Sequence, residues 1–228
     1  MSVMFLGLNR VVIDPEQVRA QSPAAVGGWM AGQFGGEPVQ WERAYRTLIA
    51  DWDSYFADLD FAGDDGVAAL WESEIRLMRG LFRLAGLPIP PLSEMSKWAY
   101  DMPRFMYHTV RAAYPDVPSA LALLSQRGYK IALFADVSSH RISGLLGGIW
   151  PGEPVALAGL LGLDVTGRFR HDAAYWQIAA LKAGAAPEMC IVIDALAESI
   201  DGAQAAGMRA FLLNRANGER LIDLVRRL

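Results

Sequence analysis

The feature that most constrains the fold is a series of five short, continuous apolar runs bounded by turn-forming residues. They lie at residues 3–8, 130–134, about 156–161, 190–193 and 210–213. Runs of this kind are typical of strands that are buried on both faces of a parallel sheet. Helical patterns separate most of them, and several end at a glycine, such as Gly128 or Gly184. The alternation predicts an α/β protein with a doubly wound parallel sheet and right-handed crossovers.

A long segment between the first two apolar runs, residues 15–113, has no strand-like alternation. Its apolar and aromatic residues recur at helical spacing, with glycine- or proline-rich breaks that divide it into roughly four helices. We therefore expect an all-helical cap at residues 15–113, inserted into an α/β core of residues 1–14 and 114–228. Five of the seven tryptophans fall in this cap. Packing is their simplest role, and an aromatic ligand cavity or a docking surface for a protein partner is the alternative.

The overall composition argues against several classes of function. The 228 residues carry a formal net charge of −4 and contain no basic block, which argues against binding to nucleic acid or to a membrane surface. No apolar run is long enough for a transmembrane helix, and no leader-type segment is recognisable, so we expect a cytoplasmic protein. The single cysteine, Cys190, excludes an intrachain disulfide and a cysteine-based zinc site.

Three segments carry a resemblance to a known family. In residues 7–14, Gly-Leu-Asn-Arg-Val-Val-Ile-Asp, the apolar run and the final Asp fit that family's first motif. Residues 114–130 are similar to the segment after its helical cap, and residues 186–208, which end in Gly-Ala-Gln-Ala-Ala-Gly-Met, are similar to its fourth motif. The chain thus resembles the haloacid dehalogenase (HAD) superfamily, in particular phosphoglycolate phosphatases and 2-haloacid dehalogenases. This resemblance implies a Rossmann-like core with the cap inserted after the first strand.

The resemblance also implies a chemistry that this chain departs from. In active family members a first Asp attacks the substrate and forms an aspartyl ester, and a second Asp donates and accepts protons. Aligned on Asp14, the nucleophile position falls on Gly7 and the acid/base position on Asn9. Gly7 can neither attack nor bind a metal, and Asn9 cannot transfer a proton. We therefore expect no aspartyl-ester chemistry, and no Mg²⁺ or other cofactor, because the first motif lacks its carboxylates.

The later motifs depart from the family pattern as well. The Ser or Thr of the second motif falls on Ala135, followed by Asp136, and the Lys of the third falls on Arg170, which keeps the charge as a planar fork. The fourth motif keeps Asp194, with Glu198 four residues later. The residues that we predict to form a binding site are Gly7, Asn9, Ala135, Arg170, Asp194 and Glu198, and no metal site is predicted.

Other side chains could take over a catalytic role. Asp136, just beyond the second strand, is the best candidate carboxylate, and His171 beside Arg170 could act as an acid or base because its pKa is ordinarily near neutrality. A solvated loop position is the simpler interpretation of His171. Ser138 or Ser139 is expected to cap the next helix rather than to form part of a catalytic triad.

These observations leave several functions open. The first is a non-hydrolytic relative that binds a small anionic molecule in the cap–core cleft, with Arg170 as the anion anchor. The second is a repurposed biosynthetic enzyme for elimination, cyclisation or isomerisation of a phosphate-, sulfate- or carboxylate-bearing substrate. The third is a divergent hydrolase with a relocated carboxylate, and the fourth is a subunit whose tryptophan-rich cap binds another protein. A homo-oligomer is compatible with all of them.

Overall fold

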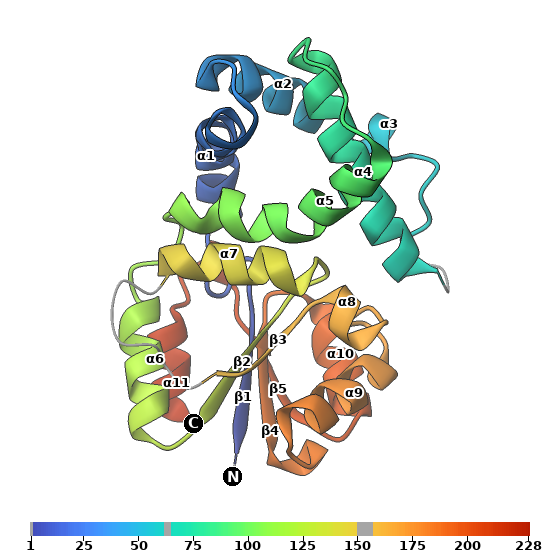
Figure 1. Cartoon of the computed structure of the whole chain (residues 1–228). Helices are drawn as coiled ribbons and strands as arrows, with labels where there is room; N and C mark the ends of the chain where they lie inside the picture. Colours follow the sequence, from blue (N-terminus) through green and yellow to red (C-terminus); the bar gives the residue numbers. More distant parts are fainter. Residues whose placement is uncertain (1, 62–64, 150–156) are drawn as a thin grey trace.

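The computed structural model describes residues 2–61, 65–149 and 157–228. Within these residues, five parallel strands form one sheet in the order β3-β2-β1-β4-β5 (Figure 1). The strands are β1 (Val3–Gly7), β2 (Lys130–Phe134), β3 (Leu157–Leu161), β4 (Cys190–Asp194) and β5 (Arg209–Leu212). This confirms the predicted α/β class with a doubly wound sheet. Residue 156, where the third strand was expected to begin, lies outside the described residues.

Helices cover both faces of the sheet, as the continuous apolar strands predict (Figure 1). One face carries α6 (Val117–Gln126) and α11 (Leu221–Arg227), and the other carries α9 (Ala173–Ala183) and α10 (Ala197–Ala205). Alternate residues of β1 point to opposite faces. Met4 and Leu6 belong to the core that includes α6 and α11, whereas Phe5 packs edge-on against Trp176 of α9 at 6.2 Å between ring centroids. The central strand therefore joins two hydrophobic cores.

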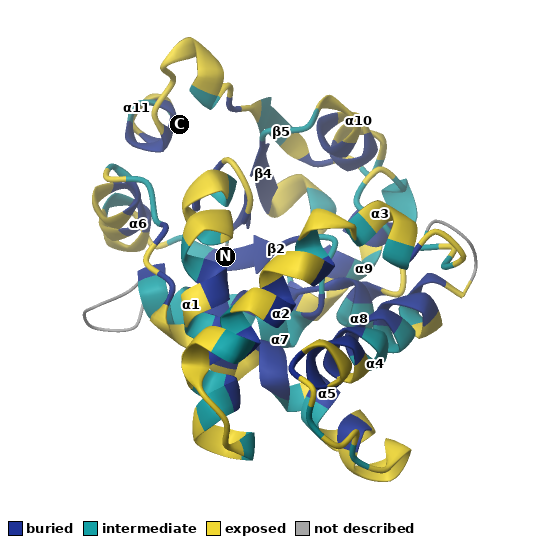
Figure 2. Cartoon of the chain, turned by 90° about the horizontal axis from the view of Figure 1, so that it is seen from above, coloured by how far each residue is buried: buried dark blue, intermediate teal, exposed yellow. Residues whose placement is uncertain are grey.

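The insertion between β1 and α6 is helical throughout its described residues and lies beyond one end of the sheet (Figure 1). It contains α1 (Pro15–Phe34), α2 (Pro38–Ala50), α3 (Trp52–Tyr55), α4 (Gly66–Leu84), α5 (Leu92–Met106) and the 3-10 turn η1 (Tyr107–Thr109), which we call the cap. Aromatic packing joins these helices, with Trp41 perpendicular to Phe82 at 5.1 Å. Figure 2 shows exposed residues on the outer sides of the cap helices and buried residues on their inner sides.

The helix α7 (Ser139–Ile149), which follows β2, connects the core to the cap (Figure 1). It packs against α5 and η1 through glycines. A Cβ on Gly144 would collide with the carbonyl oxygen of Pro103 and lie 2.8 Å from that of Arg104, and a Cβ on Gly148 would collide with the carbonyl of Val110. The two backbones therefore approach more closely than larger side chains would allow.

Short elements complete the chain: α8 (Leu163–Thr166), η2 (Pro187–Met189) and η3 (Arg215–Asn217). Among the described residues, no helix combines the length and the apolar character needed to cross a lipid bilayer.

Candidate functional site

The predicted nucleophile position, Gly7, is the last residue of β1, at the carboxyl edge of the sheet where such folds bind ligands. The pairing of β1 with β4 ends at Leu6 and Ile193, and the next residue of β4 is Asp194, whose side chain is fully buried. A Cβ built on Gly7 would collide with Oδ1 of Asp194. The carboxylate of Asp194 therefore occupies the space that a side chain at position 7 would need.

Arg170 lies between two carboxylates at this edge. Its Nη1 is 3.2 Å from Oδ2 of Asp194, and its Nε is 2.9 Å from Oδ2 of Asp136. The Arg170 side chain is only 11% exposed. Gly7, Asp136, Arg170 and Asp194 are thus brought together as neighbours, and the positive charge of Arg170 is compensated from within the chain. An external anion would have to compete with both carboxylates for this guanidinium.

The backbone that carries Arg170 is also fixed. The indole Nε1 of Trp176 donates a hydrogen bond to the Arg170 carbonyl at 2.7 Å. Gly202 of α10 allows the same carbonyl to approach, because a Cβ there would lie 2.9 Å from it. The glycine of the Asp201-Gly202 pair therefore has a packing role: it lets α10 pack against the loop that holds the site arginine.

The environment of Asp194 favours its neutral form relative to an exposed carboxyl. Burial raises the pKa of Asp194 above its ordinary value, and Arg170 opposes that effect without cancelling it. Oδ1 also accepts a hydrogen bond from the backbone N–H of Ala195 at 2.7 Å. The carboxylate is thus committed to internal partners on both oxygens.

These residues do not suit the Mg²⁺ ion that phosphatases of this fold use. Octahedral Mg²⁺ requires accessible oxygen ligands, and here Gly7 supplies no side-chain oxygen while Asp194 faces Arg170. Glu198, four residues beyond Asp194, is exposed on α10. Among the described residues, no group of three or more His, Cys, Asp and Glu side chains is arranged to hold a metal.

Asn9 lies in a tight loop rather than in the strand. Within residues 8–13, the N–H of Arg10 bonds the carbonyl of Ile13 at 2.8 Å, and that of Ile13 bonds the carbonyl of Leu8 at 2.9 Å. Arg10 has φ +62°, the only positive φ among the described non-glycine residues. Glycine ordinarily occupies such a left-handed position, because it has no Cβ.

The remaining residues singled out in the sequence take part in packing or helix capping, or are exposed. Ala135 is buried at the end of β2. His171 is exposed and stacks on Phe169 at 6.1 Å between ring centroids. Ser138 accepts a hydrogen bond from the N–H of Arg141 at 3.2 Å, which confirms the expected cap of α7, and Ser139 bonds the carboxylate of Asp164 at 2.6 Å.

A cavity of about 490 Å³ lies between cap and core, where a cleft was expected, and the residue that the sequence did not reveal there is Arg141. Its lining residues include Asn9 from the first motif and Arg141 from the first turn of α7. The Arg141 guanidinium lies 4.6 Å from the ring centroid of Tyr107, and the Tyr107 hydroxyl is 3.0 Å from that of Tyr45. The sequence signal for this arginine was the run Ser-Ser-His-Arg at residues 138–141, and its serines were interpreted only as caps of the next helix.

Glu74 of α4 interacts electrostatically with Arg141. It is buried, and burial raises its pKa to about 7, while Arg141 opposes the shift. Burial also raises the pKa of the Tyr107 hydroxyl well above its usual value. This cluster combines residues from α2, α4, η1 and α7.

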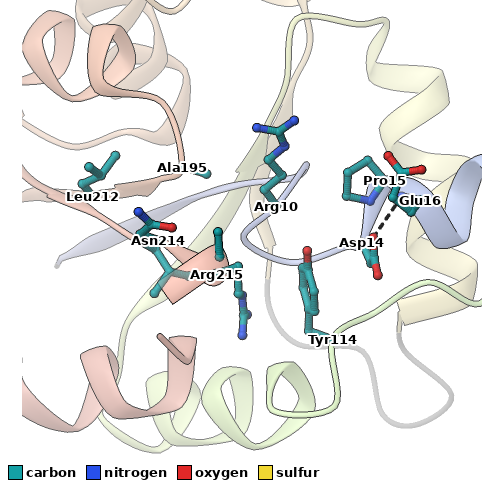
Figure 3. Close-up of a pocket in the computed structure, with 11 residues that line it drawn as sticks. Arg10, Asp14, Pro15, Glu16, Tyr114, Ala195, Leu212, Asn214 and Arg215 are labelled. Atoms are coloured by element: carbon teal, nitrogen blue, oxygen red, sulfur yellow. Dashed lines mark hydrogen bonds between the residues drawn. The ribbon is translucent and has the colours of Figure 1, made fainter. Parts of the chain in front are cut away.

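A second hollow of about 540 Å³ lies beside the carboxyl ends of β4 and β5 (Figure 3). Arg215 is firmly held there: it is 2.7 Å from Asp116, donates to the carbonyl of Val11 at 2.6 Å and lies 4.2 Å from the centroid of the Tyr114 ring. Figure 3 shows Arg10 extending in the direction opposite to Arg215. Arg215 therefore acts as a structural tie between the first-motif loop and the core.

The sheet order, the helices on both faces and the cap after β1 define an α/β fold of haloacid dehalogenase type. No protein-family model and no curated protein matches the sequence. Solved structures do match it: a HAD phosphatase from Thermococcus onnurineus with 17% identity and a TM-score of 0.53 over 96% of this chain and 89% of that one. A 2-haloacid dehalogenase from Pseudomonas syringae pv. Tomato DC3000 has 20% identity and a TM-score of 0.56 over 95% and 87%.

A defluorinating L-2-haloacid dehalogenase matches with 15% identity and a TM-score of 0.57, covering 100% of this chain and 95% of that one. Identities this low show a shared fold. The chain therefore has the fold of the HAD superfamily, with a Rossmann-like core and a helical cap, as its motifs suggested.

Proposed function

We propose that this protein is a non-hydrolytic member of its fold class, a pseudoenzyme with respect to aspartyl-ester chemistry, and that it binds a small anionic molecule between cap and core. The observation that carries the proposal is the pair formed by Gly7 and Asp194. The nucleophile position has no side chain, and the space beside it holds a buried carboxylate.

The chemical consequence is large. Removal of a covalent nucleophile typically lowers the rate by about 10⁴- to 10⁶-fold. Asp194 is not placed to substitute for it, because one oxygen accepts from the Ala195 N–H and the other faces Arg170. Asp136 pairs with the same arginine, so a proton-transfer role would first require that ion pair to open. No second catalytic function is favoured by the geometry.

Anion binding is supported by the charges that face the cleft. The family's two first-motif carboxylates are replaced by Gly7 and Asn9, which removes two negative charges from its floor. Asn9 and Arg141 both line the cap–core cavity. The role of Arg170 as the anion anchor, expected from the third motif, stays a prediction. An anion bound there would have to compete with Asp136 and Asp194 for the guanidinium.

A thermal-shift series tests the binding proposal. Purified protein is heated with sodium phosphate, sodium sulfate or sodium benzoate at matched ionic strength, with sodium chloride as the control. A ligand that binds only the folded state adds about 2.7 kcal/mol at roughly 100 times its Kd, so at least one of the three anions should raise the unfolding temperature. No shift with any of them would contradict anion binding in this cleft.

A further inference from the structure

The cap–core cavity has one wall of apolar and aromatic side chains, and its charged lining residues are Arg19, Asp53 and Arg141. Val18, Tyr45, Ile49 and Trp52 line it from α1, α2 and α3, and Arg141 faces them from α7. Its volume of about 490 Å³ is in the range of small-molecule sites. This arrangement therefore suits a ligand with an apolar body and one polar end.

Arg141 is an unpaired charge in this cavity. Among the described residues, its guanidinium makes no hydrogen bond and no ion pair, and it lies 4.6 Å from the centroid of the Tyr107 ring. Arg141 is half-buried. A partly desolvated charge without a counter-ion is costly, and native proteins ordinarily pair such groups. Arg170 and Arg215, the other half-buried arginines at the edge of the sheet, follow that rule with two carboxylates and one carboxylate respectively.

No internal carboxylate fills the role of counter-ion. Glu74 interacts with Arg141 electrostatically but makes no ion pair with it among the described contacts, and burial leaves the Glu74 carboxyl partly protonated near neutral pH. Arg19, also at the cavity, is paired with Glu16 on the exposed face of α1. Asp53, which also lines the cavity, is exposed and makes no ion pair with Arg141 among the described contacts. The half-buried group without a counter-ion is thus the Arg141 guanidinium, whose planar fork matches a carboxylate with two parallel hydrogen bonds.

We infer that this cavity binds an organic monocarboxylate, with the carboxylate paired to Arg141 and the apolar body against Tyr45, Ile49 and Trp52. The inference rests on the proposed anion-binding function and moves its anchor from Arg170 to Arg141. A single uncompensated cation favours one negative charge over a phosphate dianion. The aromatic wall favours a ligand with a ring or a branched apolar body.

Calorimetric titration with benzoate, benzamide and inorganic phosphate tests this assignment. Benzamide has the same shape as benzoate but no charge. We expect benzoate to bind at least tenfold more tightly than either of the other two. Arg141→Gln should weaken benzoate binding by about 10- to 100-fold, which corresponds to the loss of a charged hydrogen-bonded pair. Arg141→Lys should retain part of the affinity, since it keeps the charge without the fork.

Two controls separate this inference from the proposed function. Arg46→Gln removes an exposed arginine that pairs with Glu42 on α2 and should leave benzoate affinity unchanged. Arg170→Gln is the second comparison, because Arg170 is the anchor that the third motif predicts. Benzoate binding that persists in Arg141→Gln, or that is lost in an Arg170→Gln protein that is still folded, would overturn the Arg141 assignment while the proposed function stands. Absence of binding by benzoate and phosphate alike would overturn both.

The unliganded variant gives a second readout. If Arg141 is an uncompensated cation kept for a ligand, Arg141→Gln should unfold at the same or a higher temperature than the natural protein without ligand, and should lose the benzoate-induced shift. A variant that unfolds several degrees lower in the absence of ligand would show that Arg141 has a structural partner, and the inference would fail.

Discussion

At the scale of single residues, the contact between Gly7 and Asp194 determines which chemistry the sheet edge can perform. Any side chain at position 7 would extend into space that the Asp194 carboxylate fills. Asp194 in turn is held by Arg170 and by the Ala195 N–H. The absence of a side chain at position 7 and the internal pairing of Arg170 are therefore linked through Asp194, which contacts both residues.

A double-mutant cycle tests that contact. Gly7→Ala should lower the free energy of unfolding by about 1–3 kcal/mol, because the new methyl group collides with the Asp194 carboxylate. In an Asp194→Ala background the same substitution should cost much less, since the colliding oxygens are absent. Urea unfolding of the four proteins gives the coupling energy. Equal costs of Gly7→Ala in both backgrounds would show that the two residues do not compete for the same space.

Glu74 should make stability depend on pH. Burial raises its pKa from 4.5 to about 7, so the folded state holds this proton more tightly than the unfolded chain. Its favourable contribution is complete below about pH 4.5 and is lost as pH rises through 7, with an upper limit of about 3 kcal/mol. Urea unfolding at pH 5 and pH 8 should therefore show that Glu74→Gln gains stability relative to the natural protein as pH rises.

The matched control for this measurement is Glu37→Gln, which changes an exposed glutamate that makes no side-chain capping bond to α2. It should follow the pH profile of the natural protein. A Glu74→Gln profile parallel to that of the natural protein would contradict the raised pKa.

At the scale of elements, α7 determines how the cap sits on the core. Its Gly144 lies against the Pro103 and Arg104 carbonyls of α5, so Gly144→Ala should lower the free energy of unfolding by about 1–3 kcal/mol through overpacking. Gly28, in α1, is the matched control because a Cβ there meets nothing within 4 Å. Gly28→Ala should instead stabilise by roughly 0.5–1 kcal/mol through helix propensity. Thermal unfolding of both variants should give opposite shifts, and equal shifts would contradict the close packing.

The elements could be predicted because their signals are local. The apolar runs of β2 and β4 and the glycine after α9 reveal strands and helix ends without knowledge of their neighbours. Boundaries were less certain: β1 ends at Gly7 rather than at residue 8, although the Leu8 N–H still bonds the Phe134 carbonyl at 2.9 Å. Strand ends depend on which neighbour is present, and that is information the strand itself does not contain.

The site was predicted in part for the same reason. Gly7, Asp136, Arg170 and Asp194 each follow a recognisable strand or motif, so their meeting at the sheet edge could be expected. The ion pairs that neutralise Arg170 could not be expected, because they depend on side-chain directions. Arg141 and Glu74 were missed altogether. They lie in segments far apart in the sequence, and only the docking of the cap on α7 brings them together.

At the scale of the whole molecule, two arginines near the cleft between cap and core have different surroundings. The sheet edge contains a compensated Arg170, whereas the cap–core cavity contains an uncompensated Arg141. In a hydrolase of this fold the reacting group would lie at the sheet edge. Here the cation without a counter-ion is on α7, so the proposed ligand's charge would lie beside Arg141 and away from Gly7.

The central proposal is that this protein does not carry out aspartyl-ester hydrolysis, and steady-state turnover tests it most directly. Release of 4-nitrophenol from its phosphate ester with Mg²⁺, and of chloride from 2-chloropropionate, should be measured for the natural protein and for Asp136→Asn purified in parallel. The account predicts that both proteins release neither product above the rate without protein. Robust turnover by the natural protein that disappears in Asp136→Asn would contradict it and would show that a relocated carboxylate has restored the chemistry.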